Sequence, residues 1–362
     1  MKKLLAIIIS AMVVCAASGC GAQNTSSATE TTQAQTEAAP EATAAAADPT
    51  VPAGMADTIK QNEFEGVIYA VENGKAVASF ASGTLENGEK ITIDSPMPLG
   101  SVSKQFCAAA VLLLQEQGKL SVTDTLDKYF PEYADGKKLS LHNLLSMRSG
   151  ITEPTEEAGG IISDDATEAE NVAAIKKWIF SQPLNFEPDS SYAYTNANYF
   201  LLADIVEQVS GEKYVDFLRE KFFEPLGMTH TGAIIELSTN PAWAQGNIYR
   251  QVDTQPGLTK GAGDLISNAA DVTAWLNALS GGKVLSDESY KAMTTDYSPE
   301  EHYGYGLYLK LNGGVGHYGA IQIYSSFDYV NTDKNRTLVV MSNTVYPPSM
   351  TGLVGDLLED LG

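Results

Sequence analysis

Strand-like sequences lie near both ends of this chain of 362 residues, and helix-like sequences fill the middle. On the N-terminal side, 66–71 and 75–80 are strand-like and apolar, and Asn73-Gly74 between them is a strong signal for a tight hairpin turn. The expected C-terminal strands are 306–311, 320–324 and 337–342. Strands must pair to satisfy their backbone groups, so the pattern predicts one antiparallel sheet built from both termini, with a helical subdomain inserted. The expected fold class is therefore α+β, in one discontinuous domain.

Segments between these strands have the apolar patterns and the stop signals of helices. The expected helices are 102–117, 197–210, 214–223 and 271–279. Gly118 and Gly211 follow the first two, which suits residues that end helices, and Pro225 follows the third. These helices are expected to flank the sheet.

The first twenty residues have the pattern of a signal peptide. Lys2 and Lys3 precede an apolar run over 4–17, which is shorter than the roughly 20 residues that a membrane-spanning helix needs. Ala17-Ser18-Gly19-Cys20 then resembles a bacterial lipobox, with Ala17 where Leu is usual. That resemblance implies cleavage before Cys20 and a diacylglyceryl group on its sulfur. We therefore expect 1–20 to be a lipoprotein signal peptide.

A low-complexity segment follows Cys20. Residues 21–54 are mostly Ala, Thr, Gln, Ser and Glu, a composition that cannot bury enough apolar surface to offset chain entropy. We expect a disordered tether here and a folded domain over 55–362. The expected location is extracytoplasmic, on the membrane at the cell surface or the periplasmic face, through the lipid on Cys20. We expect a monomer.

Charge and residue counts exclude several classes of partner and site. The net charge of -22 repels phosphate backbones, so nucleic acid is not an expected partner. Once the signal segment is set aside, Cys107 stands alone in an apolar run, where a buried, inert thiol is expected and no internal disulfide is possible. The four histidines lack metal-ligand spacing. We therefore expect no metal and no cofactor.

A serine and a lysine stand one helical turn apart at the start of the helix expected over 102–117. Ser101 and Lys104 are spaced i, i+3, which puts both side chains on one helix face. A serine hydroxyl needs a neighbouring base to act as a nucleophile, and a partly desolvated lysine near a helix start can be that base. By itself the spacing is also consistent with a solvated surface lysine.

Two later patterns contain further polar groups. Tyr194 and Asn196 precede the helix expected over 197–210, where a phenol can shuttle protons and an amide can orient a substrate carbonyl. The ordinary alternative is a helix entry capped by Asn196. His317 leads through Gly319 into a strand, and glycine there permits close backbone approach to a bound acyl chain. A lone histidine beside a strand is more often structural.

Taken together, Ser-x-x-Lys, Tyr-x-Asn and His-x-Gly in this order resemble the class C beta-lactamases and their penicillin-binding-protein relatives, from about residue 65 to 361. The resemblance implies a beta-lactamase/transpeptidase-like fold in which Ser101 is acylated and Lys104 and Tyr194 share its proton. It further implies that Asn196 orients the substrate and that His317 offers a donor or a positive end to a substrate carboxylate. The backbone N–H groups of Ser101 and Ala320 would form the oxyanion hole.

The chain departs from the family pattern beside the third motif. Tyr318, Ala320 and Ile323 stand where relatives usually have smaller residues, so a narrower cleft is expected. Pro188-Asp189-Ser190 and Met147-Arg148 are further departures. The substrate expected is small or peptidic: a D-amino-acid peptide such as a cell-wall stem peptide, a small ester or a beta-lactam, with a peptidase or esterase favoured. The alternative is a non-catalytic ligand-binding lipoprotein that retains the fold.

Overall fold

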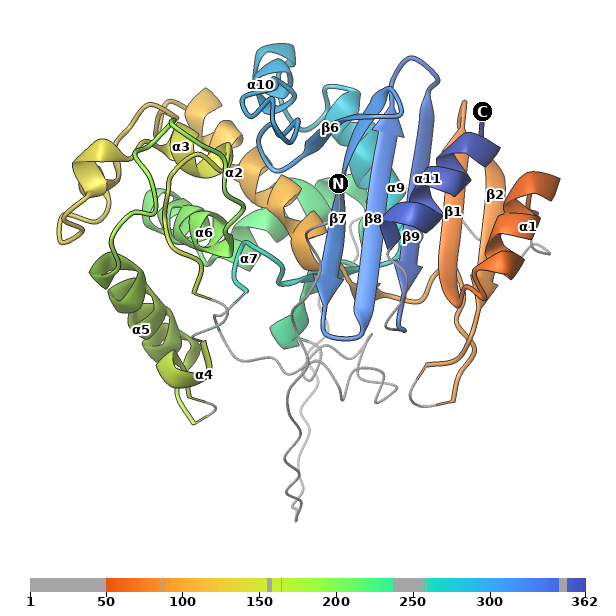
Figure 1. The fold of residues 1–362 in the computed structure, drawn as a ribbon, viewed down its shortest axis with the longest axis horizontal. Coiled ribbons are helices and arrows are strands. Elements are labelled where there is room, and N and C mark those ends of the chain that lie inside the picture. The colour runs from red at the N-terminus through yellow and green to blue at the C-terminus, as the bar shows by residue number, and fades with distance from the viewer. Residues whose placement is uncertain are drawn as a thin grey trace, which may run out of the picture. The chain divides into compact units, whose positions relative to one another are not determined.

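An antiparallel sheet of six strands, in the order β2-β1-β9-β8-β7-β6, forms the centre of the fold in the computed structural model (Figure 1). Its strands are β1 (Gly66–Glu72), β2 (Lys75–Ser82), β6 (Tyr308–Leu311), β7 (Gly314–Ile321), β8 (Tyr324–Asn331) and β9 (Arg336–Ser342). The structure describes residues 50–85, 88–154, 158–163, 165–236, 257, 259–344 and 350–362. Pairing of β1 with β9 joins the two ends of the chain, which confirms the expected α+β fold with a sheet built from both termini.

A second, smaller sheet contacts η1, the helical turn over Gly100–Ser103. It has the order β3-β5-β4, with β3 (Met97–Pro98), β5 (Leu265–Ser267) and β4 (Gly232–Ala233). The amide of Leu99, just after β3, donates to the carbonyl of Leu265 at 2.8 Å. This pairing fixes the backbone immediately before Ser101.

Helices cover both faces of the large sheet. The α-helices are α1 (Ala53–Gln61), α2 (Lys104–Glu116), α3 (Leu141–Leu145), α4 (Ala158–Ile161), α5 (Glu168–Ser181), α6 (Asn196–Ser210), α7 (Tyr214–Leu218), α8 (Glu224–Leu226), α9 (Ala269–Ser280), α10 (Asp287–Met293) and α11 (Met350–Asp360). Shorter helical turns are η1 (Gly100–Ser103), η2 (Leu126–Lys128), η3 (Gly136–Lys138), the π-helical η5 (Arg219–Phe223) and η6 (Ile234–Glu236). Helices α1 and α11 pack on one face of the sheet, and α9 packs on the other, toward the helical insertion (Figure 1).

The larger hydrophobic core lies between the sheet and the inserted helices, around α2. Phe106 of α2 stacks on Trp275 of α9 with ring centroids 4.0 Å apart, and both side chains are buried. Because α2 is apolar on nearly every side, it is surrounded by other elements instead of lying on the surface. Ser101 and Lys104, which precede its apolar run, are therefore held at a rigid junction of sheet and helices.

The structure departs most from the sequence expectation at one strand and at the start of the folded part. The stretch 320–324, expected to be one strand, crosses the turn between β7 and β8, and Gln322 there has φ 50°. Glycines weaken the strand signal of β7, which is why the sequence pattern missed it. The folded part also begins before residue 55, because the Ser79 amide donates to the Thr50 carbonyl at 2.8 Å and α1 starts at Ala53.

The expected signal peptide, Cys20 and most of the expected tether, to residue 49, lie outside the described residues. Among the helices that the structure describes, none combines the length and the apolar character needed to cross a membrane.

Candidate active site

Ser101 lies on η1, which continues directly into α2. Gly100 before it has φ 50°, a conformation that glycine adopts readily. A Cβ at Gly100 would lie 2.7 Å from the Ala320 nitrogen, so the backbone of β7 runs against the backbone that carries Ser101. This close approach places the segment that contains Ser101 against the segment that contains Ala320.

Lys104 is fully buried and its Nζ points at the serine. The Nζ donates to Ser101 Oγ at 3.0 Å, to Asn196 Oδ1 at 2.7 Å and to the carbonyl of Ala262 at 2.6 Å. Burial lowers the pKa of Lys104 to about 7, although the charges of Glu153 and Asp264 act in the opposite direction. A lysine with that pKa is partly neutral at neutral pH and can accept a proton from the hydroxyl it touches.

Tyr194 lies beside this pair. Lys104 Nζ is 4.8 Å from the centroid of the Tyr194 ring. The phenol oxygen is buried and has no hydrogen-bond partner of ordinary geometry among the described residues, while burial raises the pKa of Tyr194 well above 10 despite the nearby Ser101 hydroxyl. At neutral pH the phenol is therefore protonated, which suits a proton donor better than a base.

Asn196 is the first residue of α6, and Thr195 before it is the N-cap, accepting from the Ala197 amide at 3.2 Å. The alternative that Asn196 itself caps the helix is thus wrong. Asn196 Oδ1 accepts from Lys104 Nζ, and the backbone amide of Asn196 donates to Glu153 Oε2 at 2.5 Å. The site therefore gains a carboxylate, Glu153, that sequence reasoning missed because no spacing rule links it to the three motifs.

His317 differs from its expected role. Its side chain is 1% exposed, and Nδ1 donates to the Tyr318 carbonyl at 2.5 Å. Since a carbonyl only accepts, Nε2 must accept from the Tyr303 hydroxyl, 3.1 Å away. Burial lowers the pKa of His317 to about 3, and the charge of Lys104 adds to the effect. His317 is consequently neutral, and both of its ring nitrogens are hydrogen-bonded. The prediction that it offers a positive end or a free donor to a substrate carboxylate is therefore wrong.

Gly319 fixes the depth at which β7 packs. A Cβ there would lie 2.0 Å from the Leu99 carbonyl oxygen, which already accepts from Ser326 Oγ at 2.6 Å. Only glycine fits at this position without moving the backbone. Gly319 therefore permits a close backbone approach, as expected, but the backbone that it approaches is the segment that leads to Ser101.

Buried polar side chains on neighbouring elements hold β7, the strand that contains His317 and Gly319, in register. Asp328 on β8 accepts from the His317 amide at 2.8 Å and from Gln105 Nε2 at 2.5 Å, and Trp275 Nε1 donates to Gln105 Oε1 at 3.1 Å. This chain of contacts links β7, β8 and α2. The signal for it in the sequence is a Gln inside an apolar helix, which has no obvious role until the fold is known.

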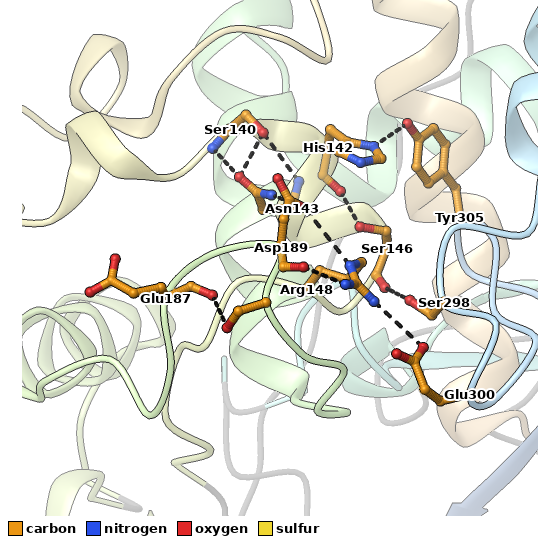
Figure 2. Close-up of polar contacts among 11 residues, drawn as sticks. Ser140, His142, Asn143, Ser146, Arg148, Glu187, Asp189, Ser298, Glu300 and Tyr305 are labelled. Atoms are coloured by element: carbon orange, nitrogen blue, oxygen red, sulfur yellow. Dashed lines mark hydrogen bonds and ion pairs between the residues drawn. The ribbon is translucent and has the colours of Figure 1, made fainter.

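Figure 2 shows a polar cluster that joins Arg148 to Glu300 and to Asp189, which lies in the loop between α5 and α6. The Arg148 guanidinium donates to the Asp189 carbonyl and lies 3.6 Å from Glu300, while Asn143 Nδ2 donates to Asp189 Oδ1 at 2.7 Å. The amide of Ala193 donates to the Met147 carbonyl at 3.0 Å, next to this cluster. Arg148 and Asp189, two of the departures from the family pattern, therefore anchor the loop that carries Tyr194.

Among the residues that the structure describes, no group of three His, Cys, Asp or Glu side chains could hold a metal ion. Cys107 is a free, buried thiol, and burial raises its pKa far above its usual value. It is not poised to act as a nucleophile.

Comparison with known proteins places this geometry in a family. The family model described as Beta-lactamase matches residues 33–359. The chain is 29% identical over 320 residues to the putative penicillin-binding protein PbpX of Bacillus subtilis (strain 168), which covers 85% of this chain and 77% of that protein. It is 25% identical over 276 residues to the teichoic acid D-alanine hydrolase of Staphylococcus aureus (strain MRSA252), across 72% of this chain and 67% of that protein. The D-amino acid amidase from Ochrobactrum anthropi SV3 has the same fold, with a TM-score of 0.71 at 22% identity, over 85% of this chain and 97% of that chain.

Proposed function

The chain belongs to the beta-lactamase family, and from this premise we propose that it is a serine hydrolase that forms an acyl-enzyme at Ser101 with the amide or ester of a D-amino acid or a short peptide. The observation that carries the proposal is the buried contact of 3.0 Å between Lys104 Nζ and Ser101 Oγ. Among the described residues Lys104 has no ion-pair partner in contact, and a buried lysine in that state is expensive to keep charged. The arrangement is therefore suited to take up a proton.

The acylation step follows from this contact. Neutral Lys104 removes the proton from Ser101 Oγ as that oxygen attacks the carbonyl carbon of the substrate. The tetrahedral oxyanion then lies toward the N–H groups of Ser101 and Ala320, whose segments pack together at Gly100. The bond to the leaving nitrogen or oxygen breaks, and the proton moves to that atom, so an amine or an alcohol departs.

Tyr194 is assigned to proton delivery. Its phenol is protonated at neutral pH and lies beside Lys104, so it can pass a proton to the leaving group and recover one from the lysine. Water then attacks the acyl-enzyme carbonyl and gives a proton to Lys104. The bond between the acyl carbon and Ser101 Oγ breaks, Lys104 returns the proton to that oxygen, and a carboxylic acid is released. Asn196 holds the Lys104 amine and the substrate carbonyl group in place.

The neutral state of His317 supports a linear amide or ester as the substrate over a beta-lactam, which is a cyclic amide. A beta-lactam carries a carboxylate, and the side chain at the position expected to bind it is buried and uncharged. The Staphylococcus aureus relative is a teichoic acid D-alanine hydrolase, which makes D-alanine a candidate acyl group for this chain. A D-alanyl amide or ester is therefore the first substrate to try.

The location of the protein is part of the proposal. The pattern over 1–20 supports export and a lipid on Cys20, with 21–49 as the tether that connects the domain to the membrane. The domain acts as a monomer at the cell surface or the periplasmic face. Metabolic labelling with a palmitate analogue should mark the wild type, and Cys20→Ala should abolish the label; a labelled Cys20→Ala protein would exclude this anchor.

Intact-mass spectrometry after exposure to a fluorophosphonate tests the nucleophile. A phosphonyl adduct on the wild type, and none on Ser101→Ala, is expected because the reagent reports an activated serine. Exposure to a penicillin in parallel separates the branches: a stable penicilloyl adduct would favour a penicillin-binding peptidase over an esterase. No adduct with either reagent would support the alternative of a ligand-binding lipoprotein.

A further inference from the structure

The phenol oxygen of Tyr194 has no hydrogen bond of ordinary geometry to any described residue that would fix it in the site. The Tyr194 ring packs instead against Tyr303 and His317, with ring centroids 6.2 Å and 6.1 Å away. The place of the phenol is therefore set by these ring contacts and by the backbone of its own loop. Whatever holds that loop also sets how well Tyr194 is placed to move a proton.

The loop between α5 and α6, which contains Tyr194, is hydrogen-bonded along its length to the segment 147–150. Three of its amides donate to carbonyls there: Asn185 to Gly150 at 2.7 Å, Asp189 to Arg148 at 2.9 Å and Ala193 to Met147 at 3.0 Å. Asp189 and Met147 have φ 67° and 60°, which residues other than glycine seldom adopt. Backbone of this kind persists only where the surrounding contacts hold it, so the loop depends on its neighbours.

Arg148 provides such a contact with its side chain (Figure 2). Nη2 donates to the Asp189 carbonyl, so the two residues are joined in both directions. Nη1 lies 3.6 Å from Glu300, in the segment that leads to Tyr303. A guanidinium can hold two partners at once because its donors are fixed in one plane. Arg148 thus connects the loop that contains Tyr194 with the segment whose Tyr303 ring packs against Tyr194.

Charge pairing alone does not explain this arrangement. The side chains of Asp189 and Glu300 are 61% and 60% exposed, and ion pairs with exposed carboxylates contribute little to stability. The Arg148 side chain is only 14% exposed, and its bond to the Asp189 carbonyl is a charge-assisted hydrogen bond to the main chain. Its loss is therefore expected to loosen the loop and to leave the fold intact.

We propose that Arg148 is a positioning residue for proton delivery by Tyr194, and that it acts by holding the Tyr194 loop against the segment that contains Tyr303. This inference rests on the proposed function, because it concerns one step of the same reaction. In that step Tyr194 gives its proton to the leaving nitrogen or oxygen as the bond to the carbonyl carbon breaks, and takes a proton back from the Lys104 ammonium. The described contacts of the Arg148 side chain do not include Ser101 or Lys104, so the attack by the serine does not need it.

Two substrates with the same acyl group and different leaving groups provide the test. The leaving nitrogen of D-alanine amide must be protonated, whereas the S-phenyl thioester of D-alanine releases a thiolate that departs without a proton. Hydrolysis by the full-length protein is followed through released ammonia and released thiophenol. Arg148→Met should lower kcat/KM for the amide by about 10²-fold, the cost of misplacing a group in the reaction, and for the thioester by less than about threefold.

Two further variants support the comparison. Arg336→Met is the matched control, because it removes a guanidinium that is 10% exposed and ion-paired with Glu72 on β1. It should keep the wild-type ratio of amide to thioester kcat/KM. Arg148→Lys keeps the charge but cannot hold two partners in one plane, so it should show the same selective loss in smaller size if Arg148→Met fails to fold.

A double-mutant cycle asks whether Arg148 acts through the phenol. Tyr194→Phe should itself lower kcat/KM for the amide more than for the thioester. Arg148→Met added to Tyr194→Phe should then lower kcat/KM for the amide by little more, because the proton donor is already absent. Losses that multiply in the double variant would overturn the inference, since Arg148 would then act by another route.

The outcomes separate this inference from the function on which it rests. Equal losses on the two substrates in the folded Arg148 variants would overturn the positioning role and leave the hydrolase intact, because the arginine would then be only structural. Unchanged kcat/KM for the amide in those variants would overturn it as well. Failure of the folded wild type to hydrolyse either substrate would reject the proposed function, and the role of Arg148 with it.

Discussion

Lys104 is the residue on which the chemistry of this site depends. All of its side chain is buried, and its amine contacts a hydroxyl, an amide oxygen and a carbonyl instead of a carboxylate. The charges of Glu153 and Asp264 raise the pKa of Lys104 and so oppose the effect of burial. Removing the amine therefore removes the base and leaves the hydroxyl of Ser101 at its ordinary reactivity.

Lys104→Ala should slow acylation by a fluorophosphonate by about 10²- to 10⁴-fold, the usual contribution of a positioned general base. Stopped-flow or gel-based labelling rates measure the effect, and thermal unfolding checks that the variant is folded. Lys119→Ala, at an exposed lysine beyond the end of α2, is the control and should react at the wild-type rate. A Lys104→Ala protein that also reacts at that rate would remove Lys104 from the mechanism.

The pH dependence of acylation should follow the same amine. Only the neutral amine can accept the serine proton, so the rate should rise with pH and reach half its maximum near the lysine pKa of about 7. Because the Glu153 charge raises that pKa, Glu153→Gln should move the midpoint to lower pH. A pH profile measured with a neutral ester would contradict this assignment if it were flat between about pH 6 and 9.

His317→Ala should impair substrates with and without a carboxylate to a similar degree. The imidazole is neutral and holds the Tyr303 hydroxyl and the Tyr318 carbonyl, so its loss disturbs the packing of β7 and removes no charge. Paired kcat/KM values for a carboxylate-bearing peptide and its methyl ester measure the effect. A much larger loss for the carboxylate would restore the role that the family resemblance implied for His317.

At the scale of elements, the contact between β7 and η1 sets the geometry of the site. Gly100 and Gly319 allow these two backbones to approach more closely than any side chain permits. The contact also explains why β7 was hard to recognise, since glycines that bring the backbones together remove the β-branched residues that mark a strand.

Gly319→Ala should lower the free energy of unfolding by about 2–4 kcal/mol, because its Cβ would overlap the Leu99 carbonyl oxygen at 2.0 Å. Gly352→Ala is the matched control: it lies within α11 with no atom near its Cβ, so it should stabilise the protein by about 0.5–1 kcal/mol through helix propensity. Urea denaturation of both variants gives the comparison. Equal stability of the two would mean that the β7–η1 contact can relax.

Sequence reasoning succeeded where a local pattern determined the element. Gly211 follows α6 with φ 79°, and Asn73-Gly74 joins β1 to β2, as their residue types predict. The i, i+3 spacing also put Ser101 and Lys104 in contact. The state of His317 could not be read in this way, because it is set by burial, by the charge of Lys104 and by the Tyr303 hydroxyl, which surround it only in the tertiary fold.

At the scale of the whole molecule, the charge of -22 is the dominant property. Such an excess of like charge opposes the compact state through self-repulsion, and salt screens it over about 8–10 Å at physiological ionic strength. We therefore expect the melting temperature to rise by several degrees between low salt and about 0.3 M NaCl. Differential scanning calorimetry checks this, and a fall in melting temperature would show that local ion pairs outweigh the overall repulsion.

The pairing of β1 with β9 has a consequence for how the protein folds during its synthesis. The β1–β2 hairpin leaves the ribosome early, but its inner edge has no partner until β9, close to the C-terminus, has been made. A two-stranded hairpin is only marginally stable by itself, and contacts between distant parts of a chain form slowly. The chain therefore stays open until synthesis is nearly complete. That delay fits the export proposed above, because a translocon passes a chain that has not yet folded.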